Sequence, residues 1–293
     1  MAVKISTAPL AAAVANCGGI GVIAGTGMSV EELRQEIQRA KEMVTGHGAL
    51  GVNVLFAATA FADLVKTAIA EGIDLVFSGA GISRDMYTWG REKDVPVVPI
   101  VSTGRLAVMA EKMGASAVVV EGKEAGGHLG TDRPLREILQ EVVGAVKIPV
   151  IAAGGIVDGE DVKEMLDAGA DGVQMGTRFA ATHESNASSE FKELYVRAGR
   201  EDVVLVDSPV GLKGRGLYNP YYARVNKDGA AIEQCIGCLK RCSQRFCIMD
   251  ALTNAHAGGD FNNALIFSGE RVDKIKQILS VREIFADIIT QLT

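Results

Sequence analysis

The sequence predicts an α/β protein, a (β/α)₈ TIM barrel. Short apolar runs such as 97–101 and 150–153 alternate with amphipathic segments of helical length. Continuous apolar strands between helices are typical of a parallel sheet that is covered on both faces. Glycine follows three of the predicted helices, at Gly72, Gly114 and Gly169, and glycine is the usual residue at a helix end. The 293 residues suffice for one barrel of about 250 residues with a small appendage. A doubly wound sheet is the alternative, because strand runs do not show closure.

The elements follow from these runs in order. Ser29 is a predicted N-cap with Glu31 and Glu32 in the first turn of its helix, where the helix dipole favours acidic side chains. Only seven strands can be counted, and Met1 stands directly before the first helix, so we expect that the chain starts late and lacks the first strand. A barrel that is open on one side is the alternative. We expect strands at 18–24, 50–56, 75–78, 97–101, 117–120, 150–153 and 173–175, and helices at 8–16, 30–44, 60–71, 83–93, 105–113, 135–143 and 159–168.

Three segments make up the predicted domain organisation. Residues 1–184 form the barrel, and 185–268 form a small helical insertion that carries most of the cysteines. Residues 269–293 return to the barrel as its final helix, with a kink or break near Ser280 in an apolar helical stripe that spans 272–292. The glycine- and proline-rich stretch 207–220 is either a loop that lines the cleft or a plain linker.

The loop after the 117–120 strand is the first candidate site. It contains Glu121, Gly126, Gly127, His128 and Gly130. Glycines let backbone N–H groups approach a ligand without a Cβ atom between them, and a histidine at a strand end is suited to proton transfer near neutral pH. The alternative is a glycine-rich turn with an incidental exposed histidine.

The loops after the last two strands are glycine-rich as well. One contains Gly154 and Gly155, and the other contains Gly176 and Thr177. In (β/α)₈ barrels the loops after the seventh and eighth strands commonly bind phosphate through backbone N–H groups. The alternative is that these glycines serve only tight turns between strand and helix.

Three segments carry a resemblance to a known family. Residues 121–128 (EGKEAGGH), 152–156 (AAGGI) and 173–179 (VQMGTRF) resemble the signature segments of the nitronate monooxygenase (2-nitropropane dioxygenase) family. That family includes the flavin-dependent type II enoyl-acyl carrier protein reductases, and residues 184–187 (ESNA) are similar to those reductases in particular. The resemblance covers about residues 1–200.

The resemblance implies a barrel that holds FMN without a covalent bond. His128 matches the family's active-site histidine, which positions or deprotonates the substrate in monooxygenase members and helps to place substrate and proton in reductase members. Met1 matches the Met of a Gly-Gly-Met turn that packs on the flavin, which agrees with a late start. The cofactor-binding residues that the resemblance implies are Met1, Asn53, Glu121, Gly126, Gly127, Gly154, Gly155, Gln174, Met175, Gly176 and Thr177, with Gly155, Gly176 and Thr177 at the phosphate and Asn53 at the ring.

Four of the five cysteines lie within 13 residues, as Cys235, Cys238, Cys242 and Cys247. Four thiolates this close suit a metal or cluster, and disulfides are unusual in cytoplasmic proteins. The compact spacing favours a [4Fe–4S] cluster, and it resembles the cluster-binding segment of iron–sulfur flavoenzymes related to old yellow enzyme. Zinc is one alternative, and reduced structural or redox thiols are another.

The composition argues against some classes of binding partner. The net charge of −6 argues against binding of nucleic acids or anionic membranes. The sequence has neither an apolar run long enough to span a bilayer nor a signal peptide, so we expect a cytoplasmic protein.

The predicted function is FMN-dependent oxidation or reduction of a small organic or acyl-carrier-bound substrate, with electrons from NAD(P)H or a ferredoxin-like donor. A nitronate monooxygenase that uses O₂ without NAD(P)H and a non-catalytic flavin or metal redox sensor are the alternatives. A homodimer is left open.

Overall fold

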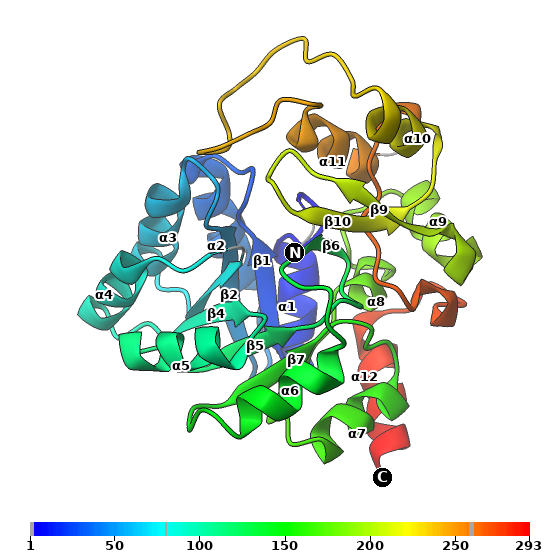
Figure 1. Cartoon of the computed structure of the whole chain (residues 1–293). Coiled ribbons are helices and arrows are strands. Elements are labelled where there is room, and N and C mark those ends of the chain that lie inside the picture. The colour runs from blue at the N-terminus through cyan, green and yellow to red at the C-terminus, as the bar shows by residue number, and fades with distance from the viewer. Residues whose placement is uncertain (1–2, 80, 258–260) are drawn as a thin grey trace.

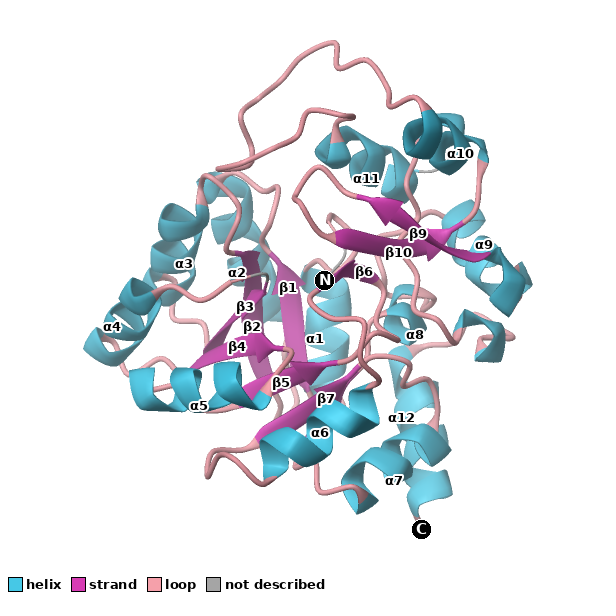
Figure 2. Ribbon diagram, in the orientation of Figure 1, coloured by secondary structure: helices cyan, strands magenta, loops and turns pink. Residues whose placement is uncertain are grey.

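The computed structural model describes residues 3–79, 81–257 and 261–293. Its centre is a curled parallel sheet of seven strands in the order β1-β2-β3-β4-β5-β7-β8 (Figures 1 and 2). Each strand pairs in parallel with the next one. The strands are β1 (Ile20–Ala24), β2 (Ala49–Leu55), β3 (Leu75–Gly79), β4 (Val97–Val101), β5 (Val118–Glu121), β7 (Val150–Ala153) and β8 (Gly172–Gln174).

The α/β class and the parallel sheet are confirmed, but the closed cylinder of eight strands is not. In the described residues β1 and β8 are the two edges of the sheet and do not pair with each other. Part of the free edge of β1 is covered by the segment before α1, because Ser6 accepts a hydrogen bond from the N–H of Ala24 and donates its hydroxyl to the carbonyl of Val22. The sheet is therefore a seven-stranded half-barrel.

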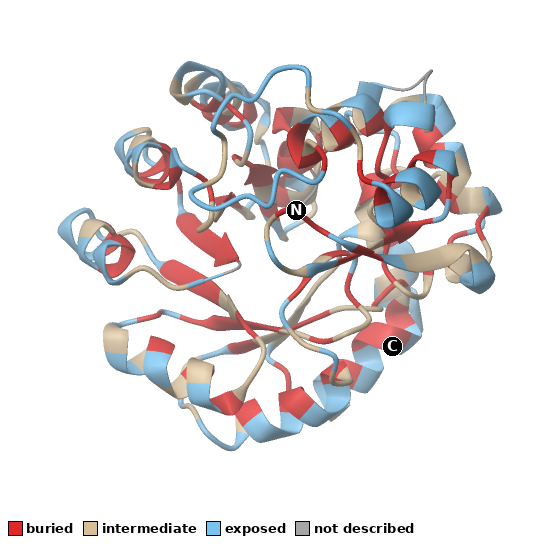
Figure 3. Cartoon of the chain, turned by 45° about the horizontal axis from the view of Figure 1, so that its top comes forward, coloured by how far each residue is buried: buried red, intermediate tan, exposed pale blue. Residues whose placement is uncertain are grey.

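Helices cover the outside of the sheet with their apolar faces turned inward (Figure 3). The predicted N-cap Ser29 is confirmed, with a reciprocal capping box to Glu32. The glycine after α5 has a left-handed φ of 97° at Gly114, which ends that helix as predicted. The helices are α1 (Ala8–Asn16), α2 (Val30–Met43), α3 (Phe61–Ala70), α4 (Arg84–Glu92), α5 (Gly104–Met113), α6 (Leu135–Val143), α7 (Gly159–Asp167) and the short α8 (Thr177–Ala180).

Two apolar cores flank the sheet. The larger one lies between the strands and the helices and includes Leu33, Val52 and Ile138, each fully buried. The smaller one lies inside the curl, where Phe77, Val119 and other side chains of alternate strand positions meet. The inner core fills the lower part of the half-barrel and leaves the carboxyl ends of the strands free to hold a site.

A second layer sits over those carboxyl ends. Residues 185–268, expected to be helical, also contain two strands, which form an antiparallel sheet with β6 in the order β6-β10-β9. The expectation missed them because Lys213–Leu217 contains two glycines and has little strand propensity of its own; pairing on both sides makes it a strand. The elements are β6 (Gly127–Leu129), α9 (Ser189–Arg197), β9 (Val203–Asp207), β10 (Lys213–Leu217), α10 (Pro220–Lys227) and α11 (Ile248–Ala257), with short 3₁₀ turns at Arg200–Asp202, Phe261–Asn263 and Val272–Lys274.

The chain then returns to the half-barrel. The helix predicted over 272–292 is interrupted near Ser280, as expected: α12 (Val281–Leu292) begins after Ser280, which caps it together with Glu283. Helix α12 packs against α7 and α1, and the side chain of Gln291 accepts a hydrogen bond from the N–H of Gly159. The last helix therefore covers the side of the sheet near its open edge.

Candidate active site

A cleft runs along the carboxyl ends of the strands, between the half-barrel and the second layer. One cavity of about 150 Å³ lies at the loops after β7 and β8. A second cavity of about 110 Å³ lies above β2 to β5. Both are lined by Glu121, Gly126, Gly127 and Phe267, so the two cavities adjoin and together suit an elongated ligand.

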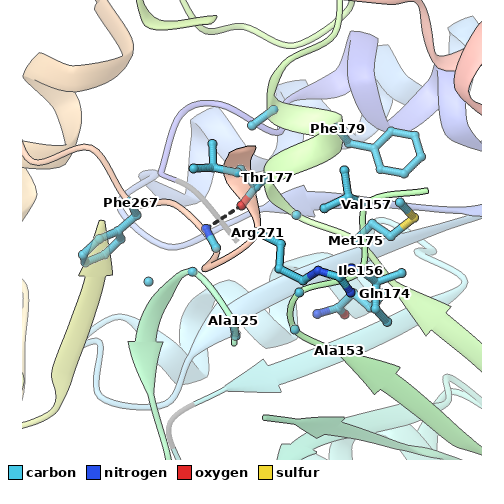
Figure 4. A pocket seen from close by; sticks show the side chains of 18 of the residues that line it. Ala125, Ala153, Ile156, Val157, Gln174, Met175, Thr177, Phe179, Phe267 and Arg271 are labelled. Carbon is cyan, nitrogen blue, oxygen red and sulfur yellow. Dashed lines mark hydrogen bonds between the residues drawn. The ribbon is translucent and has the colours of Figure 1, made fainter. Parts of the chain in front are cut away.

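The first cavity is bounded by the glycine loops that were predicted to bind phosphate. Gly154, Gly155, Gly176 and Thr177 all line it, as do Gln174 and Met175 (Figure 4). In the part of the chain that the structure describes, the backbone N–H groups of Gly155, Gly176 and Thr177 donate to no other residue. A Cβ atom built on Gly176 would meet no atom within 4 Å. This end of the cleft therefore offers unused donors around open space, which is what a phosphate requires.

The C-terminal segment 268–271 closes this cavity from the second layer. The N–H of Gly269 donates to the Thr177 hydroxyl oxygen at 2.9 Å (Figure 4). A Cβ atom on Gly126 would lie 2.6 Å from the backbone of Ser268, so only glycine permits this close approach. Arg271, which follows, also lines the cavity. Its Nη1 atom lies 2.7 Å from Oδ1 of Asp161.

The second cavity holds the predicted histidine. His128 lies on β6, opposite Gly214 of β10, and its Nε2 atom is 2.7 Å from the hydroxyl of Ser208. Its ring packs edge-to-face on Phe267 at a centroid distance of 5.1 Å. Burial lowers the pKa of His128 to about 4, so its imidazole is neutral at neutral pH. A neutral imidazole can donate and accept a hydrogen bond at the same time.

Two further polar residues face this cleft. Asn53 of β2 is only 6% exposed and lines the second cavity. Glu121, at the end of β5, lines both cavities. Burial raises the pKa of the Glu121 carboxyl to about 7, so this group changes protonation near neutral pH. The other lining side chains of the second cavity are largely apolar, with Leu239, Ile248, Met249 and Leu252 from the second layer and Leu55 and Ile100 from the strands.

The four cysteines are not arranged as a metal site. Within the described ranges no three His, Cys, Asp or Glu side chains lie where they could hold a metal ion, and all four thiols are free. Different parts of the cysteine segment are bound to different elements of the fold. Thr59 donates its N–H to the carbonyl of Cys238, Ser243 donates its N–H to the carbonyl of Pro209, and Cys247 directly precedes α11. The predicted [4Fe–4S] or zinc centre is not supported.

Sequence reasoning missed three residues of the site: Ser208, Phe267 and Arg271. Ser208 lies in the glycine- and proline-rich stretch 207–220, which forms a hairpin that lines the cleft through Val210. Phe267 and Arg271 flank a Ser-Gly-Glu segment far along the chain, and no local pattern marks them. Met1 was predicted to contact the cofactor and lies outside the described residues. No helix in the described part of the chain is long and apolar enough to cross a membrane.

Comparison with known proteins agrees with the fold and with the predicted family. The family model for nitronate monooxygenase matches residues 1–291, so the chain belongs to the nitronate monooxygenase family. A Mycobacterium tuberculosis (strain ATCC 25618 / H37Rv) relative, (3aS,4S,5R,7aS)-5-hydroxy-7a-methyl-1-oxo-octahydro-1H-indene-4-carboxyl-CoA dehydrogenase, is 32% identical over 86% of this chain and 73% of its own. A probable nitronate monooxygenase of Staphylococcus aureus (strain MSSA476) is 27% identical over 76% of this chain and 75% of its own.

Among solved structures, FabK from Thermotoga maritima superimposes with a TM-score of 0.89 and 32% identity, over 99% of this chain and 90% of that one. A nitroalkane oxidase from Streptomyces ansochromogenes has a TM-score of 0.83 at 24% identity, over 100% of this chain and 93% of that one, and shows the likeness in fold. The family and these relatives make the protein an oxidoreductase.

Proposed function

We propose that this protein is an FMN-dependent oxidoreductase that transfers two electrons between NAD(P)H and an organic substrate. The observation that carries the proposal is the continuous cleft, with free backbone donors at one end and His128 with Asn53 at the other. Membership of the nitronate monooxygenase family and the likeness to FabK support a flavin in such a cleft. FMN has a phosphate at one end and a flat ring at the other, so its phosphate would lie at the glycine loops and its ring in the cavity lined by His128 and Asn53.

The residues that would hold FMN are those that line the two cavities. Gly155, Gly176 and Thr177 would donate N–H groups to the phosphate. Glu121, Gly126 and Gly127, which line both cavities, would flank the middle of the cofactor, with Gly154, Gln174 and Met175 beside the phosphate end. Asn53 would face the ring. Bound FMN would supply the two-electron chemistry.

His128 would handle the proton. Its pKa of about 4 keeps the ring neutral, and the contact between Nε2 and the hydroxyl of Ser208 fixes the ring plane and leaves Nδ1 as the other polar atom. A neutral, oriented imidazole can hold a substrate oxygen by a hydrogen bond or accept a substrate proton. The apolar side chains around it, including Leu239 and Met249, would exclude water and favour the apolar part of a substrate, in a small molecule or on an acyl carrier.

Nitronate oxidation by O₂ without NAD(P)H is the second candidate, favoured by the family model and by the relative in Staphylococcus aureus. One experiment separates the two. The purified protein is scanned for flavin absorbance, then mixed anaerobically with NADH, NADPH or a reduced ferredoxin, and separately with an alkyl nitronate in air. Bleaching of the flavin by NADH or NADPH supports the first function, whereas O₂ consumption with nitronate alone supports the second. A protein that binds no flavin on reconstitution would contradict both.

A further inference from the structure

Arg271 is the one cationic side chain among the described residues that line the cavity at the glycine loops. The two residues before Arg271 are hydrogen-bonded to the half-barrel. The N–H of Gly269 donates to the Thr177 hydroxyl in the loop after β8, and the N–H of Glu270 donates to the carbonyl of Glu124 after β5. The Cδ atom of Arg271 lies 3.3 Å from the position of a Cβ atom built on Gly155. Arg271 is therefore placed beside both loops that offer free N–H groups.

A buried carboxylate fixes the guanidinium. Asp161 of α7 has a side chain that is 5% exposed, and its Oδ1 atom contacts Nη1 of Arg271 at 2.7 Å and Nζ of Lys274 at 2.9 Å. Its Oδ2 atom accepts the N–H of Val157. Lys274 is in turn paired with Asp158. Asp161 thus holds Arg271 by one nitrogen only.

The other two guanidinium nitrogens of Arg271 can bind a ligand. Within the described residues, Nη2 and Nε of Arg271 contact no acceptor, and its side chain is 32% exposed. Figure 4 shows the side chain reaching from the C-terminal segment across the cavity wall toward Gln174 and Ile156. A planar guanidinium with a free edge is suited to two parallel hydrogen bonds with a phosphate.

We propose that Arg271, oriented by Asp161 as a positioning residue, binds the phosphate of flavin mononucleotide. This inference rests on the proposed function and deepens it, because it assigns to one side chain the choice between a phosphorylated and an unphosphorylated flavin. The backbone donors of Gly155, Gly176 and Thr177, which line the same cavity, complete the phosphate site.

The test compares FMN with riboflavin, which has the same ring and ribityl chain but no phosphate. Flavin-free full-length protein is titrated with each, and Kd is read from the quenching of flavin fluorescence. We expect Arg271→Met to raise the Kd for FMN by about 10- to 100-fold, the scale of a lost charge-assisted hydrogen bond, and to leave the Kd for riboflavin within about twofold. Asp161→Asn should raise the Kd for FMN by less, since Arg271 remains but is no longer oriented.

Arg136→Met is the matched control, because Arg136 also pairs with a carboxylate of α7, Glu164, and lines neither cavity. It should leave both Kd values unchanged. If Arg271→Met does not fold, as judged by circular dichroism, Arg271→Lys replaces it; that variant keeps the charge but loses the bidentate geometry, and should raise the Kd for FMN alone.

The outcomes separate the inference from the proposed function. A wild-type protein that prefers FMN, together with an Arg271 variant that keeps the whole preference, would overturn the inference and leave flavin binding intact. Equal wild-type affinity for FMN and riboflavin would also overturn it. Failure of the wild type to bind either flavin would overturn the proposed function, and the inference with it.

Discussion

At the scale of single residues, the contacts of His128 come from parts of the chain that are distant in sequence. Its position after a buried strand suggested proton transfer, and the structure adds that it is half-buried, hydrogen-bonded to Ser208 and packed edge-to-face against Phe267. These two partners lie 80 and 139 positions further along the chain, and they come from a hairpin turn and from the segment before the last helix. No pattern local to residues 121–130 could have predicted them, nor the neutral state that burial imposes on the ring.

We expect His128→Ala to keep flavin bound while turnover falls by about 10²-fold or more, the scale of a lost general acid or base. The residue lines the second cavity and not the glycine loops, which is why cofactor binding should survive. Steady-state rates with the accepted donor, together with the flavin spectrum of the variant, measure both effects. His47→Ala is a matched control, since His47 lines neither cavity. Unchanged turnover in the His128 variant would mean that another group moves the proton.

His128 and Glu121 should make stability depend on pH in opposite directions. The pKa of His128 falls from about 6.5 in the unfolded chain to about 4, so the unfolded state binds more protons between these values, and stability is lost as pH falls from 6.5 to 4. The pKa of Glu121 rises from about 4.3 to about 7, so the folded state binds more protons and stability is lost as pH rises from 4.3 to 7. Each contribution is on the order of 3 kcal/mol.

Single variants separate these two effects. In the flavin-free protein, Glu121→Gln should reduce the loss of stability as pH rises toward 7, and His128→Gln should reduce the loss as pH falls toward 4. The measurement is the free energy of unfolding in urea at half-unit steps between pH 4 and pH 8. A pH profile that neither variant alters would show that the folded surroundings of these two groups do not shift their pKa values.

At the scale of secondary-structure elements, the half-barrel could be predicted and the second layer could not. Strands such as Val97–Val101 and helices such as Leu135–Val143 have the bounds that their apolar runs predict, because each run carries its own period and its own caps. β10 exists only through its pairing with β6 on one side and β9 on the other, and residues 213–217 have no strand signal without that pairing. The cysteine segment is a case in which a local pattern predicted a site that the structure does not support. Its spacing matched a metal-ligand pattern, but the hydrogen bonds of Cys238 and Ser243 to distant loops determine where the thiols lie.

The thiols should therefore react as free groups of unequal exposure. Cys235 and Cys242 are exposed, whereas Cys17, Cys238 and Cys247 are half-buried, and burial raises the pKa of each of these three thiols. Because the thiolate is the reactive form, we expect two fast and three slow alkylations by iodoacetamide at pH 8, mapped by mass spectrometry. Iron and acid-labile sulfide are measured on the same anaerobic sample. Protection of all four clustered cysteines, with stoichiometric iron, would restore the cluster that the spacing predicted.

At the scale of the whole molecule, the cleft lies between two layers that share an apolar cluster, which contains Val157 and Ala180 from the half-barrel and Phe191 and Leu217 from the second layer. The glycine loops belong to the half-barrel, whereas Phe267 belongs to the second layer and Arg271 to the segment that follows it, and both sets line the same cavity. A ligand there touches both layers, so its binding energy should oppose the unfolding of either one. The loops and the C-terminal segment are also linked directly, by the bond between Gly269 and Thr177 and by the ion pair between Arg271 and Asp161.

FMN should for this reason raise the melting temperature of the whole chain in one transition. At a free concentration 100 times its Kd, a ligand that binds only the folded state stabilises it by about 2.7 kcal/mol, which for a chain of this size corresponds to roughly 4–5 °C. Thermal unfolding is followed by circular dichroism, with Trp89 fluorescence reporting on α4 of the half-barrel and hydrogen exchange reporting on α10 and α11. AMP, which carries a phosphate but no flavin ring, is the control and should give a smaller shift. If FMN protects the half-barrel while α10 and α11 exchange at their unliganded rates, the second layer does not form part of the binding site.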